Sequence, residues 1–324
     1  MKLIETLIED AIGGVLIHNI ADAQGHKALN KGHRLNTDDV AKLRALGKTS
    51  VMVGIFEASD VGENDAATRI ANAVTSDNIS QSSVSGGRIN LYSTVRGILM
   101  VEANALMQLN VLDGITIATI ASNQVVAPQK MVATIKTIGL AIAENVLQSV
   151  EQIARQTPDI IGVRELRAAH VAVILTGSAE ARVRVEKTFL PALHGRVVEL
   201  GSQVVSDEYV EHDASAIADA IVRAKNLNAD CVILAGETSI MDMGDVTPRG
   251  ILQAGGKIEL YGAPVEPGNL LLLAYIDNLP IVGAPGCVKS RDTNVVDLVL
   301  PRLLAGERVT KHDVIALANG GLLI

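Results

Sequence analysis

The stretch LAGETSIMDMGDVTPRG, from Leu234 to Gly250, decides the fold predicted for the C-terminal half of this chain. It follows a short apolar run, passes through small and polar residues that include Gly236, and reaches aspartates at 242 and 245 before Thr-Pro begins a helix. Glycine lets backbone N–H groups approach an anion closely, and the start of a helix adds partial positive charge. The layout predicts a loop that receives a phosphorylated ligand.

The composition indicates a globular protein and argues against two kinds of partner. The chain has 324 residues, of which 48% are apolar, enough for two or three domains with buried cores. Aromatic residues make up only 2%, and the net charge is −8 with scattered Lys and Arg, which argues against nucleic-acid binding. The longest apolar run, LLLLAYI from Leu270, is too short to cross a membrane. The acidic residues in MKLIETLIEDAIGG argue against a signal peptide, so we expect a cytoplasmic protein.

Three regions are expected along the chain, with the main boundary near residue 165. Residues 1–75 are predicted to form a small α/β region, in which a helix capped by Asn36 or Thr37 ends at Gly47. Residues 76–165 are predicted to be β-rich and barrel-like, ending in a linker helix, because β-branched segments alternate with turn signals. We expect this region to be structural. Residues 166–324 are predicted to form the α/β ligand-binding domain.

The sequence from His170 onward predicts strands that alternate with helices. Strands are expected at HVAVILTG, RVVELGSQVV and DCVILAG, and a hairpin is expected at NLLLLAYIDNLPIVGAPG, with its turn at Asp277-Asn278. Helices are expected at 180–195, HDASAIADAIVRAKNLN, VTPRGILQAGG and 293–304. Continuous apolar strands that alternate with helices are typical of a mostly parallel sheet covered on both faces.

Small and polar residues follow each predicted strand, and ligands of such sheets bind beyond the carboxyl ends of the strands. The four predicted strand exits are Thr176-Gly177-Ser178, Ser206-Asp207-Glu208, Gly236-Glu237-Thr238-Ser239 and Gly283-Ala284-Pro285-Gly286-Cys287. We expect them to meet at one edge, where backbone N–H and hydroxyl donors can bind a phosphate without many Lys or Arg. Asp207, Asp242 and Asp245 are candidates to hold a hydrated Mg²⁺ against that phosphate, or to accept hydrogen bonds from a heterocycle.

Structural roles compete with these functional ones. Glycine at a strand exit is more often a turn residue than a phosphate ligand. Asp245 is equally well explained as the cap of the following helix, and Asp207 could be a turn or cap residue. Cys287 is better explained as a small loop side chain than as a ligand contact. His170 and His212 have no partners at metal-ligand spacing, so the sequence assigns them no role.

The region from about 168 to 306 resembles the molybdopterin-binding domain shared by molybdopterin adenylyltransferases and molybdopterin molybdotransferases. LAGETSIMDMGDVTP is similar to that family's Gly-Gly-Thr-Gly loop followed by Asp-Val-Thr-Pro, and VVSDE at 204–208 is similar to its Val-Pro-Asp-Asp/Glu segment. IVGAPGCVKS, which ends at Ser290, resembles the molybdotransferase loop Gly-Leu-Pro-Gly-Asn-Pro-Val-Ser, and ILTGSAE resembles its Ser-Thr-Gly-Asp-Glu.

The N-terminal segment LNKGHRLNTDDVAKLRALG also resembles a molybdotransferase segment. The whole chain looks closer to the molybdopterin-binding part of fusions that carry a nucleotidyltransferase-like domain, although we expect no such domain after GGLLI.

The resemblance implies a three-layer α/β/α domain that binds molybdopterin or the molybdenum cofactor through its phosphate. In that family two loop aspartates matter for catalysis. Asp207 matches the first, and Asp245 or Asp242 matches the second, because the loop is one residue longer here. Asp242 and Asp245 are the candidate Mg²⁺ ligands, with ATP as a possible cosubstrate. This sequence departs from the family where Glu237 lies within the glycine loop and where Cys287 replaces an Asn. A Glu beside a phosphate would repel the ligand unless it points away or holds Mg²⁺.

Binding is therefore favoured over turnover. The first hypothesis is a protein that binds molybdopterin or the molybdenum cofactor and acts in cofactor biosynthesis or maturation as a carrier or insertion factor. The alternatives are a Mg-dependent molybdopterin adenylyltransferase or molybdotransferase, and a nucleotide pyrophosphatase on the same fold. The resemblance also implies a homo-oligomer, and partners such as a molybdoenzyme or another cofactor-biosynthesis protein.

Overall fold

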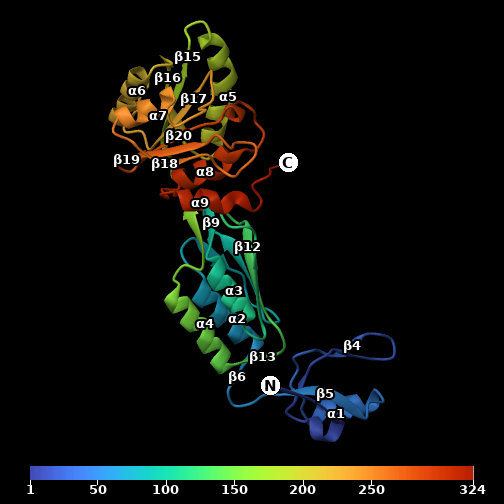
Figure 1. Ribbon diagram of the computed structural model, residues 1–324. Coiled ribbons are helices and arrows are strands. Elements are labelled where there is room, and N and C mark those ends of the chain that lie inside the picture. The colour runs from blue at the N-terminus through green and yellow to red at the C-terminus, as the bar shows by residue number, and fades with distance from the viewer. Residues whose placement is uncertain (324) are drawn as a thin grey trace. The chain divides into compact units, whose positions relative to one another are not determined.

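The computed structural model describes residues 1–323, and the chain divides into two compact units, Met1–Arg164 and a second that begins at Glu165 (Figure 1). No helix in the described residues has the length and apolar character needed to span a membrane.

The first unit contains two separate hydrophobic cores. In chain order its elements are β1 (Lys2–Leu7), η1 (Ile8–Ala11), β2 (Val15–Leu16), β3 (Ile20–Ala21), β4 (Lys27–Leu29), α1 (Thr37–Ala45), β5 (Ser50–Ile55), β6 (Asp60–Gly62), α2 (Glu63–Val74), β7 (Ile79–Gln81), β8 (Arg88–Ser93), β9 (Gly97–Val101), α3 (Ala103–Val111), β10 (Ile115–Thr119), β11 (Val125–Val126), β12 (Met131–Thr137), β13 (Ala141–Ala143), α4 (Glu144–Gln156) and β14 (Ile161–Glu165).

The smaller core lies between α1 and the antiparallel sheet β1-β5-β2. Asn36 caps α1, because its side chain accepts a hydrogen bond from the backbone N–H of Asp39 while the Asp39 carboxylate accepts one from the backbone N–H of Asn36. Val40 and Leu43 on the buried side of α1 pack into this core. The capped helix predicted from the sequence is therefore present.

The larger core of the first unit lies between helices and an open four-stranded sheet, β10-β12-β8-β7. Helix α2 packs in this core through Ile70 and Val74, and α4 packs in it through Leu147 and Val150. Helix α3 lies within the region that was predicted to be mostly β, and its Ala105 and Leu109 fall four residues apart on the buried face. The three-region division of the chain at residues 75 and 165 stays a prediction.

The second unit is built on one six-stranded sheet. Its elements are β15 (His170–Gly177), α5 (Arg182–Glu199), β16 (Gln203–Glu211), α6 (Ala214–Asn226), β17 (Cys231–Gly236), α7 (Val246–Gln253), β18 (Lys257–Tyr261), β19 (Leu272–Ile276), β20 (Leu279–Gly283), η2 (Gly286–Lys289), α8 (Val295–Leu304), α9 (Lys311–Ile315) and η3 (Ala316–Ala318). The strand order is β16-β15-β17-β20-β19-β18. The first four strands run parallel, and β19 is antiparallel to both of its neighbours, β20 and β18. The predicted α/β fold with a mostly parallel sheet is confirmed.

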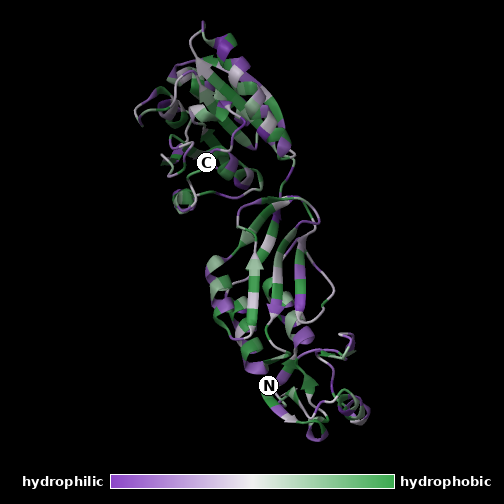
Figure 2. Ribbon diagram, turned by 90° about the vertical axis from the view of Figure 1, so that its right-hand side faces the viewer, coloured by the Kyte–Doolittle hydropathy of each residue, from purple (hydrophilic) through white to green (hydrophobic). Residues whose placement is uncertain are grey.

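Successive residues of the central strands point to opposite faces of this sheet and enter two different cores. Val171 and Val173 of β15 pack on the face covered by α5 and α8, whereas Ala172 and Ile174 pack on the face covered by α6 and α7. Figure 2 shows these strands largely in the hydrophobic colour and the helices striped with both colours. Burial on both faces explains why the strand sequences are continuously apolar.

The predicted strand RVVELGSQVV is wrong over its first half. Helix α5 continues through Pro191 to Glu199, and β16 begins only at Gln203. The buried Arg196 guanidinium donates to both carboxylate oxygens of Asp297 on α8, at 2.8 and 3.1 Å, and Val197 is fully buried beside it. These tertiary contacts stabilise a helical last turn that the β-branched residues alone do not favour.

Substituting Gly250 tests how closely α7 packs on α6. A Cβ at this position would lie 2.8 Å from Cβ of Ile217 and 2.9 Å from the Ala214 carbonyl oxygen. Removing a mid-helix glycine would by itself favour the helix by ~1 kcal/mol, but overpacking against backbone costs roughly 1–3 kcal/mol. We expect Gly250→Ala to lower the free energy of urea unfolding. Leu252→Ala, on the exposed side of α7, is the matched control and should have little effect; a stabilised Gly250→Ala would contradict the packing.

Candidate functional site

The carboxyl ends of three parallel strands lie next to one another at one edge of the second unit's sheet. Thr176 at the end of β15 is paired with Gly236 at the end of β17, and Leu234 of β17 is paired with Gly283 at the end of β20. Neighbouring strands lie about 4.8 Å apart, so the loops that follow them meet. A Cβ on Gly286 would lie 3.1 Å from the Ser239 hydroxyl oxygen. Three of the four predicted exits are therefore brought together.

Asp207 is not at this edge. It lies inside β16, paired with Val173, and its carboxylate is 3.0 Å from Nε2 of His194 on α5. The strand continues for four more residues to the pair of Gly177 and Glu211, which places Asp207 about 13 Å back along the strand at ~3.3 Å per residue. The prediction that β16 ends before Asp207 is wrong, because the strand starts later than the sequence indicated.

The end of β16 brings to this edge of the sheet residues that were not predicted as site residues from the sequence. Asp213 caps α6, since its carboxylate accepts hydrogen bonds from the backbone N–H groups of Ser215 and Ala216. This cap marks where the helix begins, so the preceding Glu211 and His212 form the exit of the strand. The cap was the sequence signal that could have corrected the strand boundary.

A cavity of about 450 Å³ opens at this edge, a size typical of small-molecule sites. It is lined by Gly177, Ser178, Ala179, Glu211, His212, Asp213, Glu237 and Thr238. Four of these residues were predicted as ligand contacts, namely Gly177, Ser178, Glu237 and Thr238. Thr176 is buried beneath them, where its hydroxyl donates to the Glu211 carbonyl oxygen at 3.2 Å and lies 3.4 Å from Nδ1 of His212.

The Glu237 carboxylate is held against the first loop. One oxygen accepts hydrogen bonds from the backbone N–H and the hydroxyl of Ser178, both at 3.0 Å, and the other accepts one from the Arg184 guanidinium at 2.8 Å. The backbone N–H of Ser178, then its hydroxyl, and the charge of Arg184 hold the pKa of Glu237 below its ordinary value. The side chain therefore points toward the loop that follows β15, and its charge is stabilised there.

Asp245 caps α7, which was one of the two roles left open by the sequence. Its carboxylate accepts hydrogen bonds from the backbone N–H of Val246 at 2.7 Å and of Met241 at 3.2 Å, and lies 4.0 Å from Nε2 of His212. Burial opposes ionisation of Asp245, but these hydrogen bonds and the nearby positive charges outweigh it and lower its pKa. Asp242 accepts a hydrogen bond from the backbone N–H of Gly244 at 2.7 Å, which forms a local turn.

These contacts do not fit the predicted Mg²⁺ site. Both carboxylate oxygens of Asp245 are bonded to backbone N–H groups, and a cation would have to displace those donors. Within residues 1–323, no three His, Cys, Asp or Glu side chains are grouped closely enough to hold a metal ion. A ligand-binding role for Asp242 or Asp245 stays a prediction.

The loop after β20 lies beside the cavity and does not line it. Pro285 precedes the short helix η2, which Gly286 begins. Cys287 is half-buried, and burial raises the pKa of its thiol. The Ser290 hydroxyl donates to the Asp292 carboxylate at 2.6 Å, which ties it to its own loop.

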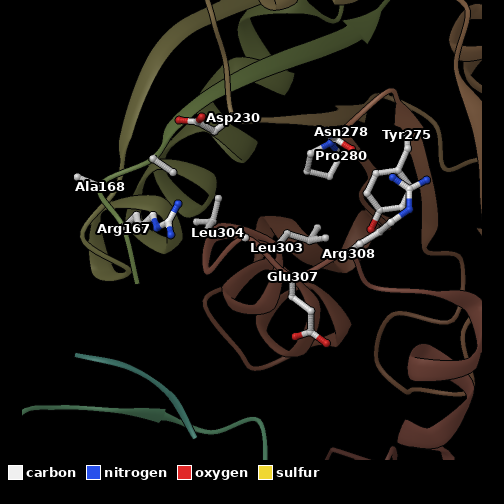
Figure 3. A pocket seen from close by; sticks show the side chains of 12 residues that line it. Arg167, Ala168, Asp230, Tyr275, Asn278, Pro280, Leu303, Leu304, Glu307 and Arg308 are labelled. Atoms are coloured by element: carbon white, nitrogen blue, oxygen red, sulfur yellow. The ribbon is translucent and has the colours of Figure 1, made fainter. Parts of the chain in front are cut away.

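A second cavity, also of about 450 Å³, lies at the opposite edge of the same sheet (Figure 3). Arg167 and Arg308 lie on two sides of it, with Leu303 and Leu304 between them. The Arg308 guanidinium stacks 4.2 Å from the centre of the Tyr275 ring, and burial raises the pKa of that tyrosine to about 12. None of the predicted site residues lines this cavity, so its volume alone does not identify a site.

Removing the Asp245 carboxylate tests its role as a cap. Asp245→Ala should reduce the free energy of unfolding by about 1 kcal/mol at pH 7, and Asp245→Asn by less, because an amide oxygen still accepts the Val246 N–H. The pKa of Asp245 is lower in the folded protein than in the unfolded chain. Its charge therefore contributes to the free energy of unfolding above the unfolded pKa of ~3.9, and this contribution is lost as pH falls through the folded pKa. Urea unfolding at pH 7 and pH 3 should show the gap between wild type and Asp245→Asn closing in acid. An Asp245→Ala protein as stable as wild type would contradict the cap.

Comparisons with known proteins give matches in both units. Residues 172–305 match the family described as a probable molybdopterin binding domain, and residues 5–54 match a domain of unknown function. No curated protein matches the chain.

The chain is also similar to solved structures at low identity. One is a molybdenum cofactor biosynthesis protein from Pyrococcus furiosus, at 13% identity over 94% of this chain and a TM-score of 0.28; this chain spans only 64% of its length. Another is a molybdopterin biosynthesis MoeA protein from Pyrococcus horikosii, at 14% identity over 94% of this chain and 75% of that one, with a TM-score of 0.32. A third is the molybdopterin biosynthesis enzyme MoaB from Thermus thermophilus, at 14% identity over 48% of this chain and 99% of that one, with a TM-score of 0.31.

Superpositions with TM-scores this low add no weight to the family match. That match confirms the resemblance that the sequence motifs indicated over 168–306. Residues 172–305, less than half of the chain, match the family described as a probable molybdopterin binding domain.

Proposed function

We propose that the second unit binds molybdopterin or the molybdenum cofactor at the cavity on the carboxyl edge of its sheet, and that the protein acts in molybdenum cofactor biosynthesis or maturation. The observation that carries the proposal is the position of this cavity. It lies within the family-matched residues, where the ends of β15, β16 and β17 present glycine and hydroxyl side chains to one space. This is the edge at which ligands of open α/β sheets bind.

The residues around the cavity divide into two chemical groups that suit a phosphorylated pterin. Ser178 and Thr238 bring hydroxyl and backbone N–H groups, which are donors for phosphate oxygens. Glu211, His212 and Asp213 bring acceptors, which suit the N–H and NH₂ groups of a pterin ring. The ligand would lie with its phosphate toward Ser178 and its ring toward the end of β16.

Binding without turnover is the form of this function that the contacts favour. Asp207, one of the two aspartates that the resemblance implied for catalysis, lies about 13 Å along β16 from the cavity edge at ~3.3 Å per residue. Asp245, the other, has both carboxylate oxygens bonded to backbone N–H groups. Adenylyl transfer from Mg-ATP would need these carboxylates to hold a metal beside the phosphate, and they are placed for other contacts. The protein would then carry or deliver the pterin.

A charge change at Ser178 tests the site. The Ser178 hydroxyl accepts a hydrogen bond from the Ala181 N–H at 3.3 Å, and the oxygen of Asp or Asn can replace it. Ser178→Asp adds a negative charge next to the bound phosphate, so we expect molybdopterin affinity to fall by at least about tenfold. Ser178→Asn introduces a side chain of nearly the same shape as Asp but without its charge, so it should weaken molybdopterin binding far less. Affinities are measured by anoxic equilibrium dialysis with detection of the pterin by mass.

Arg167→Ala is the control for the cavity at the opposite edge, and we expect it to bind molybdopterin like the wild type. The site assignment fails if Ser178→Asp binds as tightly as Ser178→Asn, or if Arg167→Ala is the variant that loses affinity.

A further inference from the structure

We propose that the Glu237 carboxylate is a built-in anion that occupies the phosphate donors of this site, so that a phosphorylated ligand binds by displacing it. The proposal rests on the proposed function only for the identity of that ligand. The anion site itself is defined by contacts within the second unit.

The donors around Glu237 are those that would bind a phosphate group. The backbone N–H and the hydroxyl of Ser178 come from the loop after β15, and the guanidinium comes from Arg184 on α5. Their distances to the carboxylate, 3.0, 3.0 and 2.8 Å, are those of hydrogen bonds, and the Arg184 distance is that of a charge-assisted one. One negatively charged group from β17's exit therefore fills a donor set drawn from two other elements.

The two Ser178 donors are held by contacts that do not involve Glu237. The Tyr209 hydroxyl donates to the Ser178 carbonyl oxygen at 2.7 Å, and the Ser178 hydroxyl accepts from the Ala181 N–H at 3.3 Å. Gly177 has no room for a side chain, because a Cβ there would collide with the Tyr209 hydroxyl and with Cβ of Glu237. The loop would thus keep its shape when the carboxylate leaves.

Glu237 is the part that can move. Its side chain is 29% exposed and can rotate toward solvent about its own bonds. A phosphate cannot share the Ser178 and Arg184 donors with the carboxylate, because the two like charges would be in contact. A dianionic phosphate monoester attracts Arg184 more strongly than a single carboxylate does, and it brings more acceptor oxygens. The site would therefore discriminate against ligands that carry only a carboxylate or no charge.

Inorganic phosphate is the probe that tests the anion site without a pterin. We would measure its dissociation constant by calorimetry for the full chain and for two single variants, Glu237→Ala and Glu211→Ala. Both remove one negative charge from the lining of the same cavity, but only Glu237 is bonded to Ser178. Glu237→Ala should bind phosphate about tenfold or more tightly than the wild type, since it frees the donors, whereas Glu211→Ala should change affinity by less than about threefold.

Glu237→Gln provides a second measurement if Glu237→Ala is unfolded by circular dichroism. Its amide oxygen still accepts from Ser178 but no longer carries the charge that pairs with Arg184, so its phosphate affinity should lie between wild type and Glu237→Ala. Equal phosphate affinity in wild type and the folded Glu237 variants, or an equal gain in Glu211→Ala, would overturn the proposal. A gain in phosphate binding with no molybdopterin binding would uphold the anion site and refute the proposed function instead.

Discussion

The parallel pairing of β15 with β17 is the interaction on which the candidate site depends. It sets Thr176 opposite Gly236, and so brings Ser178 and Glu237, which are 59 positions apart in the chain, within 3.0 Å of each other. The pairing is stabilised by burial on both faces, with Val173 and Ile233 in one core and Ile174 and Val232 in the other. A shift of such a buried pair by one residue would move every side chain to the opposite face, so the register is strongly specified. The register in turn sets which residues of the two following loops lie next to each other.

In the site that we propose, the donors that would bind a phosphate already hold the Glu237 carboxylate. In an acidic protein, a carboxylate beside a phosphate-binding loop would be expected to weaken ligand binding through repulsion alone. The contacts of Glu237 give it a more specific effect, since it occupies the same hydrogen-bond donors that a phosphate would need. Arg184 from α5 then serves both states, because it can pair with the carboxylate or with a bound phosphate. Under this proposal, ligand binding would exchange one anion for another at the same donors.

Most of the strands and half of the residues that line the cavity could be predicted, because they depend on local patterns. Continuous apolar runs gave β15, β17 and the β19–β20 hairpin, and the small residues after them marked the edge where the cavity opens. The second strand was misplaced because Arg196 and Val197 are helical for tertiary reasons, namely the contact with Asp297 and burial in the core. That error moved Asp207 to the edge and left out His212. The contact between Glu237 and Arg184 could not be predicted, because the two residues are brought together only by the packing of α5 on the sheet.

The central claim is that this protein binds molybdopterin and leaves it chemically unchanged. The most direct test is one anoxic incubation of the purified chain with molybdopterin, Mg-ATP and molybdate, followed by identification of the protein-bound and free pterins by mass. We expect protein-bound molybdopterin of unaltered mass, and no other product above a control without protein. Adenylylated pterin or molybdenum cofactor above that control would show turnover, and the absence of any bound pterin would remove the proposed ligand. Either result would refute binding without turnover.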